Sequence, residues 1–167
     1  ALLNGLSSQG RVLLGGDVAV QLVHRETTPQ EHQFLERYGH VSEMISMRGM
    51  AYAIKNGAEA DRSLIELKGV DSLYPLYGQI ALSTGASLKS ALACDMQTCG
   101  AVAEQSLLDH LHIARGGILR IGTQNFRFNA TLTNEPDRWS GGFSLGPHVV
   151  VSDAARKGQS LVTLGSL

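Results

Sequence analysis

The order of apolar and polar positions predicts strands in the first part of the chain. From Val12 to Val23 apolar residues alternate with polar or small ones, which is typical of a strand with one buried face. The segment from His40 to Ile54 is also strand-like, and its apolar positions change parity near Arg48 and Gly49, where a bulge would move the inward face. A third strand is predicted from Ser63 to Lys68, and its apolar content indicates a central place in the sheet.

The clearest helix signal lies between the first two predicted strands. Thr28 is an N-cap residue, Pro29 suits the first helical position, and Glu31 is placed to bond back to the cap. Gly39 supplies a stop, so a helix is predicted from Pro29 to Tyr38. With the strands around it, this helix gives the order β-α-β-β in the first 70 residues. A turn at Asn56-Gly57 is predicted to join the second and third strands.

The second part of the chain contains shorter elements. Helices are predicted from Ala86 to Ala93 and from Gly100 to Ile113. Strands are predicted from Gln79 to Leu82, Ile118 to Ile121, Phe126 to Leu132 and His148 to Ser152, the middle two as a hairpin. Together these elements predict an α+β fold, with small mixed sheets and packed helices.

The composition narrows the class of protein. The 167 residues suffice for one domain, or for two small lobes folded together. A net charge of −1 leaves no basic footprint for nucleic acid, and 43% hydrophobic against 17% charged residues excludes intrinsic disorder. No apolar run reaches the roughly 18 to 20 residues that cross a bilayer. Because Ala1 to Gly5 lacks an initiator Met and a signal-peptide pattern, we expect a soluble piece of a longer protein.

Two cysteines, Cys94 and Cys99, lie five residues apart. The pair forms either a small-loop disulfide in an oxidising compartment or two free thiols, and the spacing alone leaves both open. It does not match the usual spacing of paired zinc ligands, and the six histidines have no ligand spacing among them. No metal site is therefore predicted.

The signals for catalysis are weak. Ser144 fits the pattern Gly-x-Ser-x-Gly, and His148 could serve as its base, which makes a small serine esterase or hydrolase one alternative. A hydrolase elbow needs a helix after the serine, whereas Pro147 and then a strand follow it here. Glu135 and Asp137 flank a proline and are interpreted as turn residues with solvated charges. The sequence therefore predicts a protein that is not an enzyme.

Six short runs, in their order and spacing, resemble the periplasmic core domain of MacB-type ABC transporter permeases. The runs are Arg11 to Asp17, Tyr74 to Gly78, Val102 to Gly116, Glu135 to Arg138, Gly146 to Val149 and Leu164 to Leu167. More narrowly, they are similar to the first periplasmic domain of YbbP-like permeases, relatives of FtsX, LolC and LolE. The chain departs from the pattern at Gly117, where the family often has Asp, and in the cysteine-bearing segment from Ala93 to Gly100.

The resemblance implies a domain held between two transmembrane helices at the periplasmic face of the bacterial inner membrane. It implies a porter-like βαββ lobe, about residues 1–70 with part of the C-terminal half, and a second, smaller β-rich lobe. It further implies no cofactor in this domain and ATP used by a separate cytoplasmic subunit. The expected partners are the permease's own transmembrane helices, that ATPase subunit and a periplasmic protein. The expected cargo is hydrophobic, lipid-like or a lipoprotein.

Two sets of residues are singled out for this role. Trp139, Phe143 and Leu145 follow Glu135 on a predicted loop and are candidates for contact with cargo or a partner, the alternative being that they pack the loop itself. Glycine-rich joints at Gly78, Gly85, Gly100 and Gly141-Gly142 are expected to act as hinges. A free-standing periplasmic binding module that recruits a partner through its sheet edge is a third interpretation.

Overall fold

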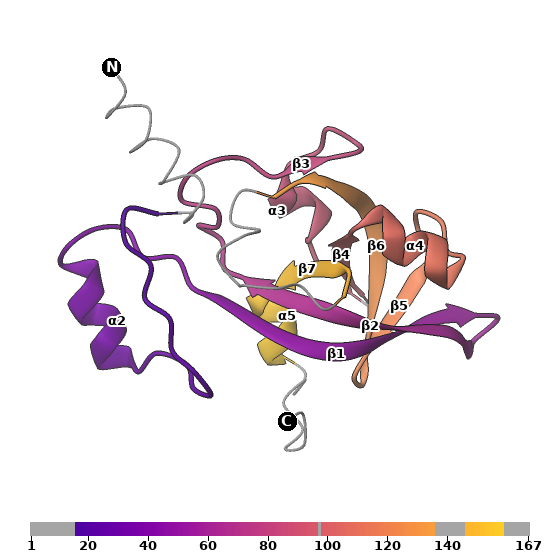
Figure 1. Ribbon diagram of the computed structural model, residues 1–167, viewed down its shortest axis with the longest axis horizontal. Coiled ribbons are helices and arrows are strands. Elements are labelled where there is room, and N and C mark those ends of the chain that lie inside the picture. The colour runs from indigo at the N-terminus through magenta and orange to yellow at the C-terminus, as the bar shows by residue number, and fades with distance from the viewer. Residues whose placement is uncertain (1–15, 97, 136–145, 159–167) are drawn as a thin grey trace.

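The computed structural model describes residues 16–96, 98–135 and 146–158 (Figure 1). The helices are α2 (Pro29–Glu36), α3 (Leu88–Ala91), α4 (Gln105–Leu111) and α5 (Asp153–Gly158). The strands are β1 (Met44–Lys55), β2 (Ala58–Val70), β3 (Ala81–Leu82), β4 (Cys99–Ala103), β5 (Ile118–Ile121), β6 (Gln124–Asn134) and β7 (His148–Ser152). Among the described residues, no helix is both long enough and apolar enough to span a membrane.

The strands form one mixed sheet of seven, in the order β3-β6-β4-β7-β2-β1-β5. Two pairings are parallel, β2 with β7 and β4 with β6, and the others are antiparallel. Because β5 pairs with β1 on one side and with β6 on the other, every strand except β3 belongs to a closed ring. The predicted α+β class is confirmed, while the division into two lobes stays a prediction.

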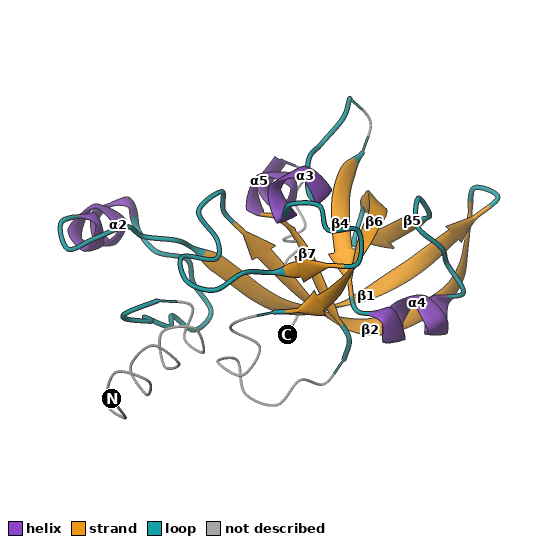
Figure 2. Cartoon of the chain, turned by 90° about the horizontal axis from the view of Figure 1, so that it is seen from above, coloured by secondary structure: helices purple, strands orange, loops and turns teal. Residues whose placement is uncertain are grey.

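The interior of this ring is the main core. It receives buried side chains from all the strands of the ring and from α4. These include Ala51, Ala53, Ile65, Leu67, Ala101, Leu107, Leu111, Leu119, Phe126, Phe128 and Val149. Small alanines on β1 and β4 leave room for the leucines of α4, which lies on the side of the sheet opposite to α3 (Figure 2).

A second, smaller core lies on the outer face of β4 and β7. Val102 and Val150 pack there against Leu92 beside α3 and Leu82 of β3. Gly100 makes the close approach of α3 possible, since a Cβ on this residue would lie 2.0 Å from the carbonyl oxygen of Ala91. Gly100 is thus a buried residue of β4 at a tight packing contact, and it is not the flexible joint that we expected there.

The hairpin of β1 and β2 shows both a success and an error of pattern analysis. Asn56 and Gly57 form its turn, as predicted, and both have positive φ, 52° and 78°. The register is regular through Arg48 and Gly49, where we predicted a bulge, and shifts instead between Tyr52 and Ile54. The inward face of β1 continues through Ala51 and Ala53. Met50, Tyr52 and Ile54 alternate with these alanines and misled the prediction, because the interior of the ring takes the small side chains here.

Two element predictions were wrong. The strand predicted from Val12 to Val23 is absent over its described part, residues 16–23, where Val18 is 80% exposed. The alternation of residues has the pattern of a strand, but a strand also needs a neighbour to pair with, and the pattern does not indicate one. The helix predicted from Gly100 to Ile113 begins only at Gln105, because the four residues from Gly100 to Ala103 belong to β4 and are buried on both faces. A short apolar run without periodicity fits either structure.

Candidate functional site

The helix α2 and the segment before it form an exposed unit beside the sheet (Figure 1). Thr28 and Glu31 make the predicted capping box, and Arg25 adds an ion pair to Glu31 with N–O distances of 2.7 and 2.8 Å. The Arg25 guanidinium and the amide and hydroxyl of Thr28 lower the pKa of Glu31 to about 2. The prediction of this helix is confirmed, although it ends two residues earlier than expected. No residue of α2 is buried.

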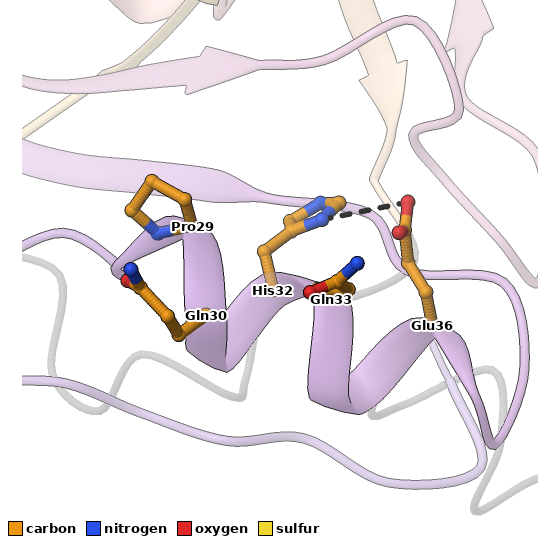
Figure 3. A pocket seen from close by; sticks show the side chains of 5 residues that line it. All are labelled: Pro29, Gln30, His32, Gln33 and Glu36. Atoms are coloured by element: carbon orange, nitrogen blue, oxygen red, sulfur yellow. Dashed lines mark ion pairs between the residues drawn. The ribbon is translucent and has the colours of Figure 1, made fainter.

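The two sides of α2 differ in character. One side, seen in Figure 3, is a polar depression lined by Pro29, Gln30, His32, Gln33 and Glu36. His32 Nδ1 lies 3.4 Å from the Glu36 carboxylate, across one turn of the helix. The other side is an apolar groove whose lining includes Val20, Leu22, Phe34 and Leu35. Since one helix supplies the whole polar lining, this depression does not bring catalytic groups together from separate elements.

A buried group of charges lies where β2 meets β7, and we call Glu66, Lys68, Glu135 and His148 the charge cluster. Glu66 and Lys68 share a face of β2, and His148 is the cross-strand neighbour of Glu66. Glu135 follows β6, forms an ion pair with Lys68 and contacts His148 Nδ1 at 2.8 Å. The Lys68 ammonium also lies 3.5 Å from the hydroxyl of Tyr74. Lys68, Glu135 and His148 are all buried.

The charge cluster shifts two pKa values in opposite directions. Burial raises the pKa of Glu135, but the hydrogen bond to His148 and the charge of Lys68 outweigh it, so the pKa falls below its ordinary value. The hydrogen bond to Glu135 raises the pKa of His148, and burial only partly opposes this. The ring's Nε2 is buried and lies 3.3 Å from the Glu66 carboxylate without a well-directed hydrogen bond. The arrangement therefore favours a charged histidine between two carboxylates.

This geometry gives no support to the esterase alternative. A serine nucleophile needs a histidine nitrogen that faces it and the substrate. Both nitrogens of His148 face carboxylates, and the ring is buried. Ser144 itself lies outside the described residues. Within the described part of the chain, no three His, Cys, Asp or Glu side chains are placed to hold a metal ion either.

Ion pairs of the buried Arg156 link the segment before α2 to the helix α5. The Arg156 side chain, 2% exposed, donates from Nε to Asp153 and from Nη2 to Glu26, each at 2.7 Å. Burial lowers the pKa of Arg156, but the two carboxylates raise it by more than burial lowers it. The pKa is therefore above its ordinary value, and the guanidinium stays charged. It packs over Gly69 of β2, where an added Cβ would lie 3.3 Å from Arg156 Cδ. We call this contact the Arg156 tie.

The cysteines lie in a tight hairpin before β4. Cys94 and Cys99 are joined by a disulfide, with an S–S distance of 2.03 Å. Asp95 accepts a hydrogen bond from the amide of Thr98 at 2.7 Å and pairs with Arg127 of β6 at 2.8 Å. The disulfide-closed loop is therefore fastened to the sheet at the point where β4 starts.

The structure places the sequence-predicted residues unevenly. The candidates for cargo or partner contact, Trp139, Phe143 and Leu145, lie outside the described residues, as do Gly141 and Gly142. Glu135, which we interpreted as a solvated turn residue, is buried in the charge cluster, so that interpretation was wrong. The one available signal was Lys68, a charge in a strand predicted to be central, since a buried lysine needs a partner. Nothing in the sequence marked Arg156.

Comparison with known proteins adds one informative likeness. No protein-family model matches the sequence, and no curated protein sequence matches it. Among solved structures, the extracellular domain of the noncanonic ABC-type transporter YknZ from Gram-positive bacteria matches at a TM-score of 0.52 and 15% identity, over 80% of this chain and 66% of that one. The periplasmic region of MacB from Actinobacillus actinomycetemcomitans matches at 0.48 and 11%, over 73% of this chain and 51% of that one. This chain therefore spans between half and two thirds of these two structures, and it shares the fold of the YknZ domain.

Proposed function

We propose that the chain is the extracytoplasmic domain of an ABC transporter permease of the MacB type and that it acts in export without catalysing a reaction. The observation that carries this proposal is the fold shared with the extracellular domain of YknZ over 80% of the chain. The charge cluster supports the absence of catalysis, because its one histidine is buried between carboxylates.

The packing of the domain supports a mechanical role. The closed ring of strands is a rigid body, because no strand of the ring can shift without breaking pairings on both sides. The Arg156 tie then fastens the segment before α2 to the helix α5. Motion applied at either end would pass through the ring as a whole, which is the requirement for transmitting movement from transmembrane helices.

The energy source and the cargo complete the proposal. ATP would be used by a separate cytoplasmic subunit, with this domain at the periplasmic face of the membrane. The cargo would be hydrophobic, lipid-like or a lipoprotein, contacted through the apolar residues Trp139, Phe143 and Leu145. A periplasmic partner protein would bind the domain on this same side of the membrane.

Labelling the protein in cells tests its location. The variant Arg62→Cys is expressed with its natural flanking sequence, and spheroplasts are treated with a membrane-impermeant maleimide. Arg62 is exposed on β2, and Cys94 and Cys99 are disulfide-bonded, so the wild type serves as the unlabelled control. We expect labelling of the variant before lysis. Labelling that requires lysis would place the domain in the cytoplasm and refute the proposal.

Export itself tests the mechanical role. Gly69→Ala pushes against Arg156, whereas Gly39→Ala has open space around its added Cβ and is the matched control. In the intact transporter, we expect Gly69→Ala to reduce export per ATP hydrolysed several-fold while the protein still reaches the membrane. Unchanged coupling in Gly69→Ala would count against transmission through the Arg156 tie.

A further inference from the structure

The strand β1 is paired along both edges for only part of its length. On one side it pairs with β2 from Met44 to Lys55, whereas on the other side β5 covers only Ala51 to Ile54. Among the described strands, only β2 therefore neighbours residues 44–50, and we call this stretch the open edge of β1. It starts on the α2 side of the molecule and ends where the pairing of β1 with β5 begins (Figure 1).

The ladder between β1 and β2 shows which backbone groups of the open edge face outward. The amide of Asp71 donates to the carbonyl of Glu43 at 3.2 Å, so these opposing residues are a hydrogen-bonded pair. Hydrogen-bonded and non-bonded pairs alternate along antiparallel strands. The even-numbered residues of the open edge therefore direct their N–H and C=O groups away from β2; they are Met44, Ser46, Arg48 and Met50.

An independent contact agrees with this assignment. Glu66 lies opposite Arg48 in the ladder, so its amide should also point away from the β1–β2 pair. It donates to the carbonyl of Pro147, on the β7 side, at 3.0 Å. The alternation of inward and outward backbone groups therefore holds across both strands of the hairpin.

The outward groups of the open edge show no partner among the residues that the structure describes. Within the described part of the chain, the backbones of Met44, Ser46, Arg48 and Met50 make no hydrogen bond outside the β1–β2 ladder. Natural proteins usually protect such an edge with lysines, proline, a bulge or a covering segment. The open edge has one charge, Arg48, no proline and a regular register. It is therefore a ready template for an added strand.

We propose that the open edge of β1 binds the same edge of a second copy of this chain, as an antiparallel pair about a two-fold axis at Met47. In this register Met44 faces Met50 of the second copy, and Ser46 faces its Arg48. Every outward N–H and C=O group of residues 44–50 then finds a partner. The sheets of two copies would become continuous across the axis.

The side chains favour this register among the self-pairings. A two-fold axis at Arg48 would place two guanidinium groups opposite each other, which is destabilising. An axis at Ser46 would leave Met50 unpaired. With the axis at Met47, Arg48 faces a serine, and methionines meet methionines. The edge is thus complementary to itself, and a second copy needs no additional residue to bind.

Charge substitutions at Ser46 test the register, because this side chain is exposed and faces Arg48 of the second copy. Sedimentation velocity over a concentration series gives the dimer Kd of the 167-residue chain. We expect Ser46→Lys to raise the Kd about fivefold and Ser46→Glu to lower it by a similar factor, since the pair occurs twice in the dimer. Thermal unfolding at low concentration verifies that the monomer is equally folded in both variants.

Cross-linking tests the position of the axis. Met47→Cys would place two cysteines as a non-hydrogen-bonded pair with Cα atoms about 4.5 Å apart, within the range that a disulfide spans. Under mild oxidation we expect a covalent dimer from Met47→Cys and none from Arg62→Cys, which lies away from the open edge. Adding Ser46→Lys to Met47→Cys should slow the cross-link.

The results decide the proposal without reference to export. A chain that sediments as a monomer at every concentration overturns it. A dimer whose Kd is the same for Ser46→Lys and Ser46→Glu, or one that cross-links equally at residues 47 and 62, places the interface elsewhere and also overturns it. Because the isolated chain is measured, the proposed transporter role can fail while the dimer stands, and the reverse holds too.

Discussion

Lys68 carries a charge into residues 67–70, the buried end of β2, which is otherwise without charge. The chain tolerates it because Glu135, far away in sequence, reaches the same place and is held there by His148. Burying charges is costly, and their attraction repays this cost only when every partner is present. The charge cluster therefore makes the position of β7 beside β2 specific, since a shift in register would separate His148 from both carboxylates.

Removing one carboxylate should expose this dependence. We expect Glu135→Gln to lower the free energy of unfolding by about 3 kcal/mol, because Lys68 loses its buried counter-charge. Urea denaturation followed by circular dichroism measures it. The double variant Lys68→Met with Glu135→Leu is the control and should recover much of the loss, as it removes both charges. A Glu135→Gln variant as stable as the wild type would show that the pair contributes nothing.

The same residues predict how stability depends on pH. The pKa of His148 is raised in the folded chain, so its contribution is complete below its unfolded value of 6.5 and is lost as pH rises through the folded value. The pKa of Glu135 is lowered, so its contribution is complete above 4.5 and is lost as pH falls through the folded value. Other charges facing this ring are Glu66, Lys68 and Glu104, with Tyr74 beside Lys68.

We therefore expect maximal stability between about pH 5 and pH 6.5, with a loss on either side. Urea midpoints recorded across the pH range measure the two limbs. His148→Gln should remove the decline above neutral pH while keeping most of the acid limb. If the variant and the wild type decline in parallel above pH 7, another group is responsible.

At the scale of elements, helices and strands are positioned by contacts between distant segments. The helix α5 was not predicted, and it holds its place through Arg156, which lies over the bare backbone of Gly69. The glycine leaves the space that the guanidinium fills, and Glu26 closes the contact from the other end of the described chain. The helix propensity of neighbouring residues does not indicate such a contact between distant segments.

Gly69→Ala should loosen this tie without removing a charge. Its Cβ would lie 3.3 Å from Arg156 Cδ, which is closer than ordinary packing allows. We expect amide hydrogen exchange to quicken about tenfold or more around Glu26 and in α5, with a smaller change in β1. Gly39→Ala, with nothing near its added Cβ, should leave exchange in both segments unchanged. Equal exchange in the two variants would contradict the role assigned to the tie.

The disulfide loop is a second element-level device. Because it fastens the start of β4, we expect its removal in Cys94→Ser with Cys99→Ser to cost about 2 kcal/mol, as a small closed loop predicts. Alkylation followed by mass spectrometry should modify no cysteine before reduction and both afterwards. Alkylation of the folded protein without reductant would mean that the thiols are free in solution.

At the scale of the whole molecule, closure of the sheet decides which residues are core. All the strands of the ring and α4 contribute to one interior cluster, and small alanines face large leucines across it. The ring also explains the open edge, since β5 closes against only the second half of β1. The closed ring and the open edge therefore arise from the same pairing pattern.

The interior of the ring should tolerate substitution far less than the outer face of its strands does. Leu107 of α4 is fully buried, whereas Leu64 of β2 is 46% exposed. We expect Leu107→Ala to lower the free energy of unfolding by about 3 kcal/mol and Leu64→Ala by under about 1 kcal/mol. Chemical denaturation of both variants measures the contrast. Similar losses would mean that α4 does not pack within the ring in solution.

The sequence by itself determined the α+β class, the capped helix α2, the Asn56-Gly57 turn and the strands β2, β5, β6 and β7. These depend on neighbours in the chain, through capping, turn geometry and alternation. Only the tertiary structure decided that Gly100 to Ala103 form a strand, that residues 16–23 do not, and that Glu135 is buried. These outcomes depend on whether a distant strand or charge is available as a partner, and no local pattern records that.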